Sequence, residues 1–204
     1  MLSAIVSSLF DHLADYSSRP WFLLLIFGIA LFDSVIPIVP SETTVIIGGV
    51  AAGAGQQNLV AVILVAWCGA LIGDNLAYQL GVSASTFLKR TLFRGTKGAK
   101  RLVWAENQLQ ERGGMLLVTG RFIPGGRTAI TVASGITRQP RRRFFAFVAL
   151  AAAIWATYAS LLGYLGGKAF ADDHTKAFLL AFAAAISVSV TMEAIRWFRH
   201  RKVA

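Results

Sequence analysis

Charged residues are scarce in this sequence of 204 residues. Asp, Glu, Lys and Arg make up 15% of the chain, whereas about a quarter is usual in a soluble domain. Hydrophobic residues make up 55%, and they gather in long runs. A bilayer core about 30 Å thick takes roughly 20 apolar residues for each helical crossing. The shortage of charge therefore excludes an ordinary globular surface, and the sequence predicts one all-α integral membrane domain.

Cysteine and histidine are scarcer still. Cys68 is the single cysteine, and His12, His174 and His200 lie too far apart in sequence for a ligand pattern. We therefore expect no internal disulfide, no metal site and no cofactor. The Ser, Thr and His residues form no recognisable nucleophilic arrangement, so we expect no catalytic residues and no enzyme.

Acidic residues are half as frequent as basic ones, ten against twenty, which gives a formal net charge of +10. Such a balance can indicate nucleic-acid binding, but here the basic residues lie between the apolar runs. They gather over 89–112, 138–143 and 196–202. Cytoplasmic loops that face anionic lipid have this distribution. We therefore expect membrane lipids as partners, no nucleic acid, and both termini in the cytoplasm.

Prolines and charged residues interrupt two of the apolar runs. The first, over 21–54, contains Asp33, Pro37, Pro40 and Glu42. The second, over 115–135, has arginines in place of acids. The residues that form and flank its bend are Arg121, Pro124, Gly125, Gly126 and Arg127. Such bends leave backbone N–H and C=O groups without helical hydrogen bonds, and these groups must be satisfied within protein or at a water-filled cavity. Both runs therefore predict re-entrant helical hairpins.

Three longer apolar stretches are candidates for simple crossings, over 59–80, 144–167 and 177–195. With the helix that starts at Trp21 they predict about four transmembrane helices. The charge bias makes the two hairpins enter from opposite faces of the membrane. That arrangement indicates an inverted-repeat, transporter-like fold with its substrate site near the midplane.

We divide the chain into three parts. Apolar residues at helical spacing predict an interfacial amphipathic helix over 1–18 rather than a signal peptide. The membrane transport domain covers 19–168. A C-terminal transmembrane helix and a basic cytoplasmic tail cover 169–204.

Arginine is costly inside a bilayer, by about 2.5–3.5 kcal/mol on insertion scales, so Arg121 and Arg127 need anionic partners. Asp33 and Glu42 are the first candidates for these partners, and Asp74 is a further one. One interpretation is a purely structural salt-bridge network. The other is an anion site, because guanidinium groups bind phosphate bidentately and broken helices add N–H donors.

Three motifs resemble those of the DedA family, within the superfamily of SNARE-associated or VTT-domain proteins. They are Phe32-Asp33-(x)2-Ile36-Pro37-(x)2-Pro40-Ser41-Glu42, Gly69-(x)3-Gly73-Asp74-(x)3-Tyr78-(x)2-Gly81 and Gly120-Arg121-Phe122-Ile123-Pro124-Gly125-Gly126-Arg127. The likeness covers about residues 20–168. It implies transporters with two opposed re-entrant hairpins that translocate lipids such as undecaprenyl phosphate or phospholipids in a way that depends on the proton motive force.

The sequence therefore predicts a flippase for a lipid phosphate in a bacterial plasma membrane. Arg121 and Arg127 would bind the phosphate, and Asp33 and Glu42 would be the proton-coupling carboxylates. The supporting residues would be Asp74, Pro37, Pro40, Pro124, Gly125 and Gly126. A cation/proton antiporter, a passive phospholipid scramblase, an enzyme acting on a lipid phosphate and a membrane scaffold are the alternatives.

Overall fold

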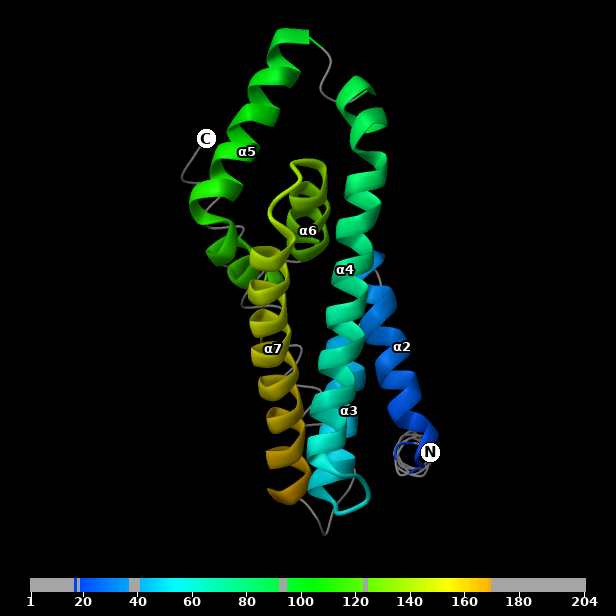
Figure 1. The fold of residues 1–204 in the computed structure, drawn as a ribbon. Coiled ribbons are helices and arrows are strands. Elements are labelled where there is room, and N and C mark those ends of the chain that lie inside the picture. The colour runs from blue at the N-terminus through cyan, green and yellow to red at the C-terminus, as the bar shows by residue number, and fades with distance from the viewer. Residues whose placement is uncertain (1–16, 18, 37–40, 92–94, 123–124, 170–204) are drawn as a thin grey trace, which may run out of the picture. The chain divides into compact units, whose positions relative to one another are not determined.

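The structure is a computed structural model that describes residues 17, 19–36, 41–91, 95–122 and 125–169. In this part of the chain every assigned element is helical (Figure 1). The elements are α2 (Trp21–Val35), α3 (Ser41–Gly53), α4 (Leu59–Thr91), α5 (Gly95–Thr119), the 3-10 helix η1 (Gly120–Phe122), α6 (Gly126–Ile136) and α7 (Arg141–Ala169). The helices expected over 1–18 and 177–195 lie outside the described residues, and so do Pro37, Pro40 and Pro124.

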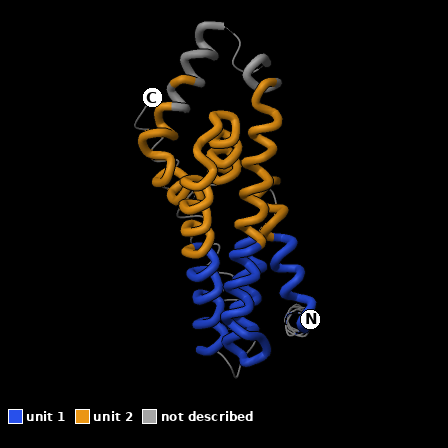
Figure 2. Tube along the Cα trace, in the orientation of Figure 1, with its two compact units in different colours: residues 1–29, 40–68, 155–204 blue, residues 30–39, 69–154 orange. Residues whose placement is uncertain are grey.

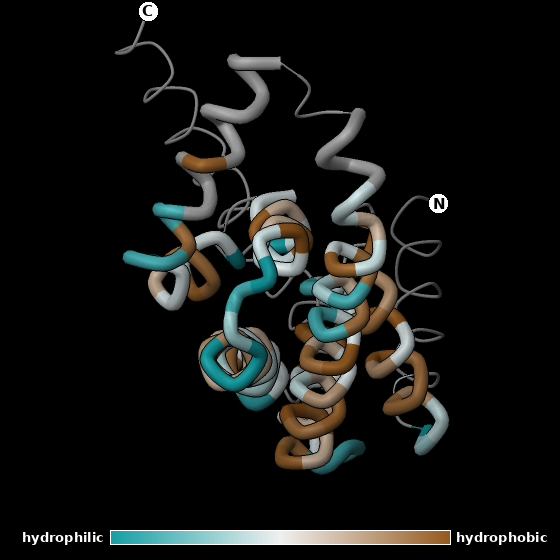
Figure 3. Tube along the Cα trace, turned by 45° about the horizontal axis from the view of Figure 1, so that its top comes forward, coloured by the Kyte–Doolittle hydropathy of each residue, from teal (hydrophilic) through white to brown (hydrophobic). Residues whose placement is uncertain are grey.

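Among the residues that the structure describes, two helices are long and apolar enough to cross a membrane, Leu59–Thr86 within α4 and Arg141–Ala169, which is α7. The 15-residue α2 is also apolar but shorter. Large hydrophobic side chains such as Leu24 and Leu64 are exposed on these helices, and hydrophobic stretches run along the helices in Figure 3. Exposed apolar surface of this kind is typical of contact with lipid. The all-α prediction is confirmed for the described residues.

Helix α5 joins two segments that the sequence analysis separated, the basic stretch up to Arg112 and the start of the second interrupted run. The sequence analysis placed a boundary between Arg112 and residue 115, but Gly113 and Gly114 lie within α5, which continues to Thr119. A Cβ at Gly113 would lie 2.3 Å from Gln139 Nε2, and one at Gly114 would lie 2.4 Å from Phe147 Cζ. These glycines make room for neighbouring side chains and do not end the helix.

The chain packs as two compact units, which Figure 2 colours separately. Unit 1 comprises Met1–Ile29, Pro40–Cys68 and Trp155–Ala204, and unit 2 comprises Ala30–Val39 and Gly69–Ile154. Helices α2, α4 and α7 each contribute residues to both units. The division assigns the candidate site residues to one unit or the other.

Within unit 1, α3 packs against α7 through glycine. A Cβ added to Gly49 would lie 2.3 Å from the carbonyl oxygen of Ser160, and one added to Gly163 would lie 2.1 Å from that of Ile46. No side chain fits between backbones this close, so the two helices touch directly. Small residues allow such approaches in membrane helices.

Within unit 2, α4 and α6 repeat this contact. A Cβ on Gly81 would lie 2.3 Å from the carbonyl oxygen of Val132, and one on Gly135 would lie 2.1 Å from that of Tyr78. The Tyr78 ring packs on Phe144 with centroids 4.5 Å apart. Among the described residues, each unit therefore has a contact between paired glycines that packs a short helix, α3 or α6, directly against a long one.

Candidate functional site

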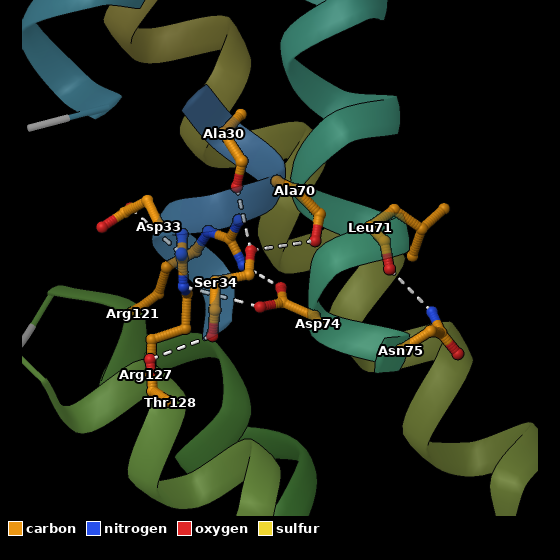
Figure 4. A network of polar contacts seen from close by, with 10 residues as sticks. All are labelled: Ala30, Asp33, Ser34, Ala70, Leu71, Asp74, Asn75, Arg121, Arg127 and Thr128. Carbon is orange, nitrogen blue, oxygen red and sulfur yellow. Dashed lines mark hydrogen bonds and ion pairs between the residues drawn. The ribbon is translucent and has the colours of Figure 1, made fainter. Parts of the chain in front are cut away.

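The site in unit 2 is built around Asp74, which lies on α4 and is fully buried. The close approach of α2 to α4 accounts for this burial. A Cβ on Gly73 would lie 2.4 Å from the carbonyl oxygen of Leu31, so only glycine fits there. The Ser34 hydroxyl donates a hydrogen bond to the Ala70 carbonyl at 3.3 Å (Figure 4). These contacts hold the end of α2 beside the carboxylate of α4.

Arg121 reaches Asp74 from η1, directly after the end of α5. Its Nη1 donates to Asp74 Oδ2 at 2.7 Å, and the two side chains are only 2% and 1% exposed. Taking both ions out of water costs several kcal/mol for each, and their attraction compensates only when the geometry is close. The short contact provides that geometry.

Arg127 is the second residue of α6 and contacts two carboxylates. Its Nη2 donates to Asp33 Oδ2 at 3.0 Å, and its Nε lies 3.5 Å from Asp74 Oδ1. The chain enters α6 through Gly125, whose φ of 69° is a left-handed conformation that favours glycine. The Thr128 hydroxyl donates to the Ser34 carbonyl at 3.1 Å and ties this helix start to α2.

The charge cluster consists of Asp33, Asp74, Arg121 and Arg127, and its formal charges sum to zero. The longest ion pair of the cluster joins Asp74 Oδ1 to Arg127 Nε at 3.5 Å, and Asp74 Oδ1 accepts no hydrogen bond. The beginning of α6 has no side-chain cap, so backbone N–H groups there are available to an acceptor. An anion that displaced a carboxylate would meet guanidinium and backbone donors together.

Glu42 lies in unit 1, at the second position of α3, and accepts a hydrogen bond from the Tyr158 hydroxyl of α7. The sequence analysis expected an arginine as its partner and did not single out Tyr158. It also missed Ser34 and Thr128, which position the end of α2 beside α6. The signal that could have found Tyr158 is a polar group inside an apolar run, because Tyr158 lies within the span expected over 144–167.

The structure thus brings together four of the residues that the sequence selected: Asp33, Asp74, Arg121 and Arg127. Asp74 was ranked as a supporting residue, but it contacts both arginines. Gly125 and Gly126 form the entry into α6. These residues come from four elements, α2, α4, η1 and α6 (Figure 4).

Comparison with known proteins agrees with the resemblance to the DedA family that the motifs show. The family model described as "VTT domain" matches residues 39–165. "Inner membrane protein YohD" of Escherichia coli is 28% identical over 81% of this chain and 85% of the relative. "Undecaprenyl phosphate transporter A" of Bacillus subtilis is 28% identical over 71% and 73%. "Protein DedA" of Escherichia coli is 22% identical over 95% and 90%. No solved structure gives a significant match.

Proposed function

We propose, since the chain belongs to the VTT-domain (DedA) family of bacterial membrane proteins, that it translocates a lipid phosphate across the plasma membrane. The name of one relative, an undecaprenyl phosphate transporter, supports a polyprenyl phosphate as the substrate class, with a phospholipid as the alternative. The protein would move the lipid without changing it chemically.

The observation that carries this proposal is the pair of arginines in the charge cluster. Arg121 and Arg127 both contact Asp74, and their side chains are only 2% and 11% exposed. Guanidinium groups form forked, charge-assisted hydrogen bonds with phosphate oxygens. A phosphate headgroup would displace the aspartates from these donors and take their place. The lipid tail would stay among the exposed apolar side chains in the bilayer, so only the headgroup would cross.

Re-entrant hairpins over 37–53 and 115–135 are part of the proposal. Two internal likenesses of the units support it. The glycine contact between α3 and α7 has the same form as the contact between α6 and α4. The second residue of each short helix is charged, Glu42 in α3 and Arg127 in α6. Inverted repeats produce paired elements of this kind, and they place substrate sites near the midplane.

Dependence on the proton motive force is the second part of the proposal, with Asp33 and Glu42 as the coupling carboxylates. A carboxylate deprived of its cation in a low-dielectric site tends to take up a proton. Headgroup binding that separates Asp33 from Arg127 would therefore link phosphate and proton, and this linkage is reciprocal.

A flipping assay tests the proposal. The full-length protein is reconstituted into phosphatidylcholine vesicles that carry trace amounts of a labelled polyprenyl phosphate or phospholipid, and the accessibility of the headgroup is followed. We expect protein-dependent flipping with no change in lipid mass. A changed mass would identify an enzyme. Cation-driven proton flux without flipping would identify an antiporter. Flipping indifferent to an imposed pH gradient would identify a passive scramblase.

A further inference from the structure

The two arginines of the charge cluster lie on the two sides of one bend in the chain. Arg121 lies in η1, directly after α5, and Arg127 is the second residue of α6. Helices α5 and α6 contact each other, and both contact η1 (Figure 1). A Cβ on Gly120 would lie 2.1 Å from Ile130 Cδ1, so η1 packs closely on α6. We call residues 109–139 the arginine hairpin, because this segment carries both arginines near its bend.

A buried glutamine connects the two sides of the arginine hairpin at the end opposite the bend. Gln139 follows α6 in the chain and is only 5% exposed. Its Nε2 donates to the carbonyl oxygen of Leu109 in α5 at 3.1 Å. A helical carbonyl oxygen has a second lone pair for such a donor. The amide lies against the α5 backbone, since a Cβ on Gly113 would lie 2.3 Å from Gln139 Nε2.

The two sides of the hairpin have matching lengths. From Leu109 to the end of α5 at Thr119 the chain advances ten residues, which is about 15 Å along a helix. Helix α6 has 11 residues, or about 16 Å. The Gln139 side chain therefore bridges to α5 at the level where α6 ends, and the hairpin is held at both of its ends.

Two further contacts hold Gln139 itself in place. Its backbone N–H donates to the Ser134 carbonyl at 2.9 Å, and its own carbonyl accepts from the Tyr78 hydroxyl of α4 at 2.7 Å. Tyr78 lies one helical turn after Asp74, on the same face of α4. Since Asp74 contacts both arginines, α4 supports the hairpin near its bend through Asp74 and at the opposite end through Tyr78.

We infer that Gln139 is a positioning residue for Arg121 and Arg127, because it holds the two sides of the arginine hairpin at a fixed spacing. This inference rests on the proposed function, in which both guanidinium groups bind one phosphate headgroup. Two guanidinium groups share one phosphate only at a matching separation, and a small displacement of either weakens binding. Gln139 does not bind the phosphate and acts through the helices that carry the arginines.

Distances between spin labels test this arrangement without any substrate. The labels are attached at Met115→Cys in α5 and Ala129→Cys in α6, which are both exposed positions. The full-length protein carries Cys68→Ser and is reconstituted into phosphatidylcholine vesicles. Gln139→Leu replaces the amide by an apolar side chain of similar size and removes the donor to α5. We expect a broader distance distribution with a longer mean in this variant.

Flipping rates at increasing mole fractions of a labelled polyprenyl phosphate separate positioning from a structural role. Gln139→Leu should raise the half-saturating mole fraction about tenfold, the effect of weakening one charged hydrogen bond. The maximal rate should change less. A purely structural role would instead lower the unfolding temperature and leave the half-saturating mole fraction of the folded protein unchanged, and this result would overturn the inference.

Gln110→Leu is the matched control, because it makes the same exchange at an exposed position of α5, next to Leu109. The backbone carbonyl of Gln110, which accepts from Arg143 Nη1 at 3.1 Å, is kept. This control should leave both the label distances and the half-saturating mole fraction unchanged.

Gly113→Ala disrupts the same contact from the α5 side, because the new Cβ would displace the Gln139 amide. It should reproduce the broader distance distribution. Combined with Gln139→Leu it should add little, since both changes act on one contact. If Gln139→Leu fails to fold, Gly113→Ala decides the question, and a distance distribution unchanged by it would overturn the inference.

The two kinds of measurement keep the inference and the proposed function separable. Distance distributions that are identical in Gln139→Leu and Gln110→Leu would overturn the role of Gln139, whatever the flipping result. Broadening in Gln139→Leu, while the unaltered protein flips no lipid, would reject the transport function and retain Gln139 as the residue that spaces the arginines.

Discussion

Asp74 contacts both arginines of the charge cluster through different oxygens. Its Oδ2 accepts from Arg121 Nη1 at 2.7 Å, and its Oδ1 faces Arg127 Nε at 3.5 Å. One buried carboxylate thus neutralises charge on two chain segments that follow each other around a bend. Removing its charge should affect both of them.

We expect Asp74→Asn to destabilise the protein by about 3–5 kcal/mol, because a buried guanidinium then lacks its counter-ion. Thermal unfolding in detergent, followed by circular dichroism, measures this. The double variant Asp74→Asn with Arg121→Gln should recover part of the loss, since neither charge remains. A double variant as unstable as the two single changes added together would contradict the pairing.

Arg127→Lys should lower the rate of headgroup flipping by about tenfold or more, since a point charge replaces a fork and a charged hydrogen bond is lost. The same change at Arg141, which is exposed at the start of α7, is the matched control and should be silent. Normal flipping by Arg127→Lys would rule out forked phosphate recognition at this residue.

An inward proton gradient should accelerate flipping by the unaltered protein. We expect Glu42→Gln to remove this acceleration, because an amide cannot exchange a proton, and Asp33→Asn to remove it by unbalancing the charge cluster. The measurement compares vesicles with and without an imposed pH gradient. Equal acceleration in Glu42→Gln and in the unaltered protein would exclude coupling through this residue.

The glycine contacts give a prediction about stability. Gly163→Ala should destabilise unit 1, and Gly135→Ala unit 2, by about 1–3 kcal/mol each, because the new Cβ would meet a backbone carbonyl at 2.1 Å. Gly28→Ala is the control. It lies within α2 with nothing within 4 Å of its Cβ position, so alanine should be neutral or slightly stabilising there. Unfolding temperatures in detergent test all three.

Single-cysteine labelling in a Cys68→Ser background tests the proposed topology. Cysteines placed at Gln56 and Asp173 should react from outside, and those at Lys97, Arg142 and Arg201 from the cytoplasm. Gln56 is preferable to Gln57 because Gln56 is exposed, while the Gln57 amide donates to two backbone carbonyls. Labelling of Gln56 and Lys97 from the same side would contradict the two-hairpin proposal.

The sequence predicts the helical class and the meeting of acids with arginines, because apolar runs and buried charge carry strong local signals. The end of α5 was harder to predict. Gly113 and Gly114 resemble a helix terminus, but their role depends on Gln139 and Phe147, which lie far along the chain. Contacts between residues so far apart in the chain cannot be predicted from the local sequence around the glycines.

The ranking of the acids shows the same limit. Charge alone made Asp33 and Glu42 equal candidates for the arginines. Their actual neighbours depend on which helix packs on which. Gly73 and Ser34 bring Asp33 and Asp74 to Arg127, whereas α7 brings Tyr158 to Glu42. Pairings of this type become visible only once the tertiary contacts are known.

The zero sum of the charge cluster bears on how the membrane voltage would act. Two arginines and two aspartates carry no net charge across the field when the site holds no lipid. A bound phosphate headgroup adds negative charge to that neutral set. Each elementary charge moved through the full potential is worth about 2.3 kcal/mol per 100 mV. Under the proposed coupling, a proton taken up with the headgroup would offset one of these charges, so the voltage would act on whatever charge remains uncompensated in the loaded form. The return of the empty, neutral cluster would be electrically silent.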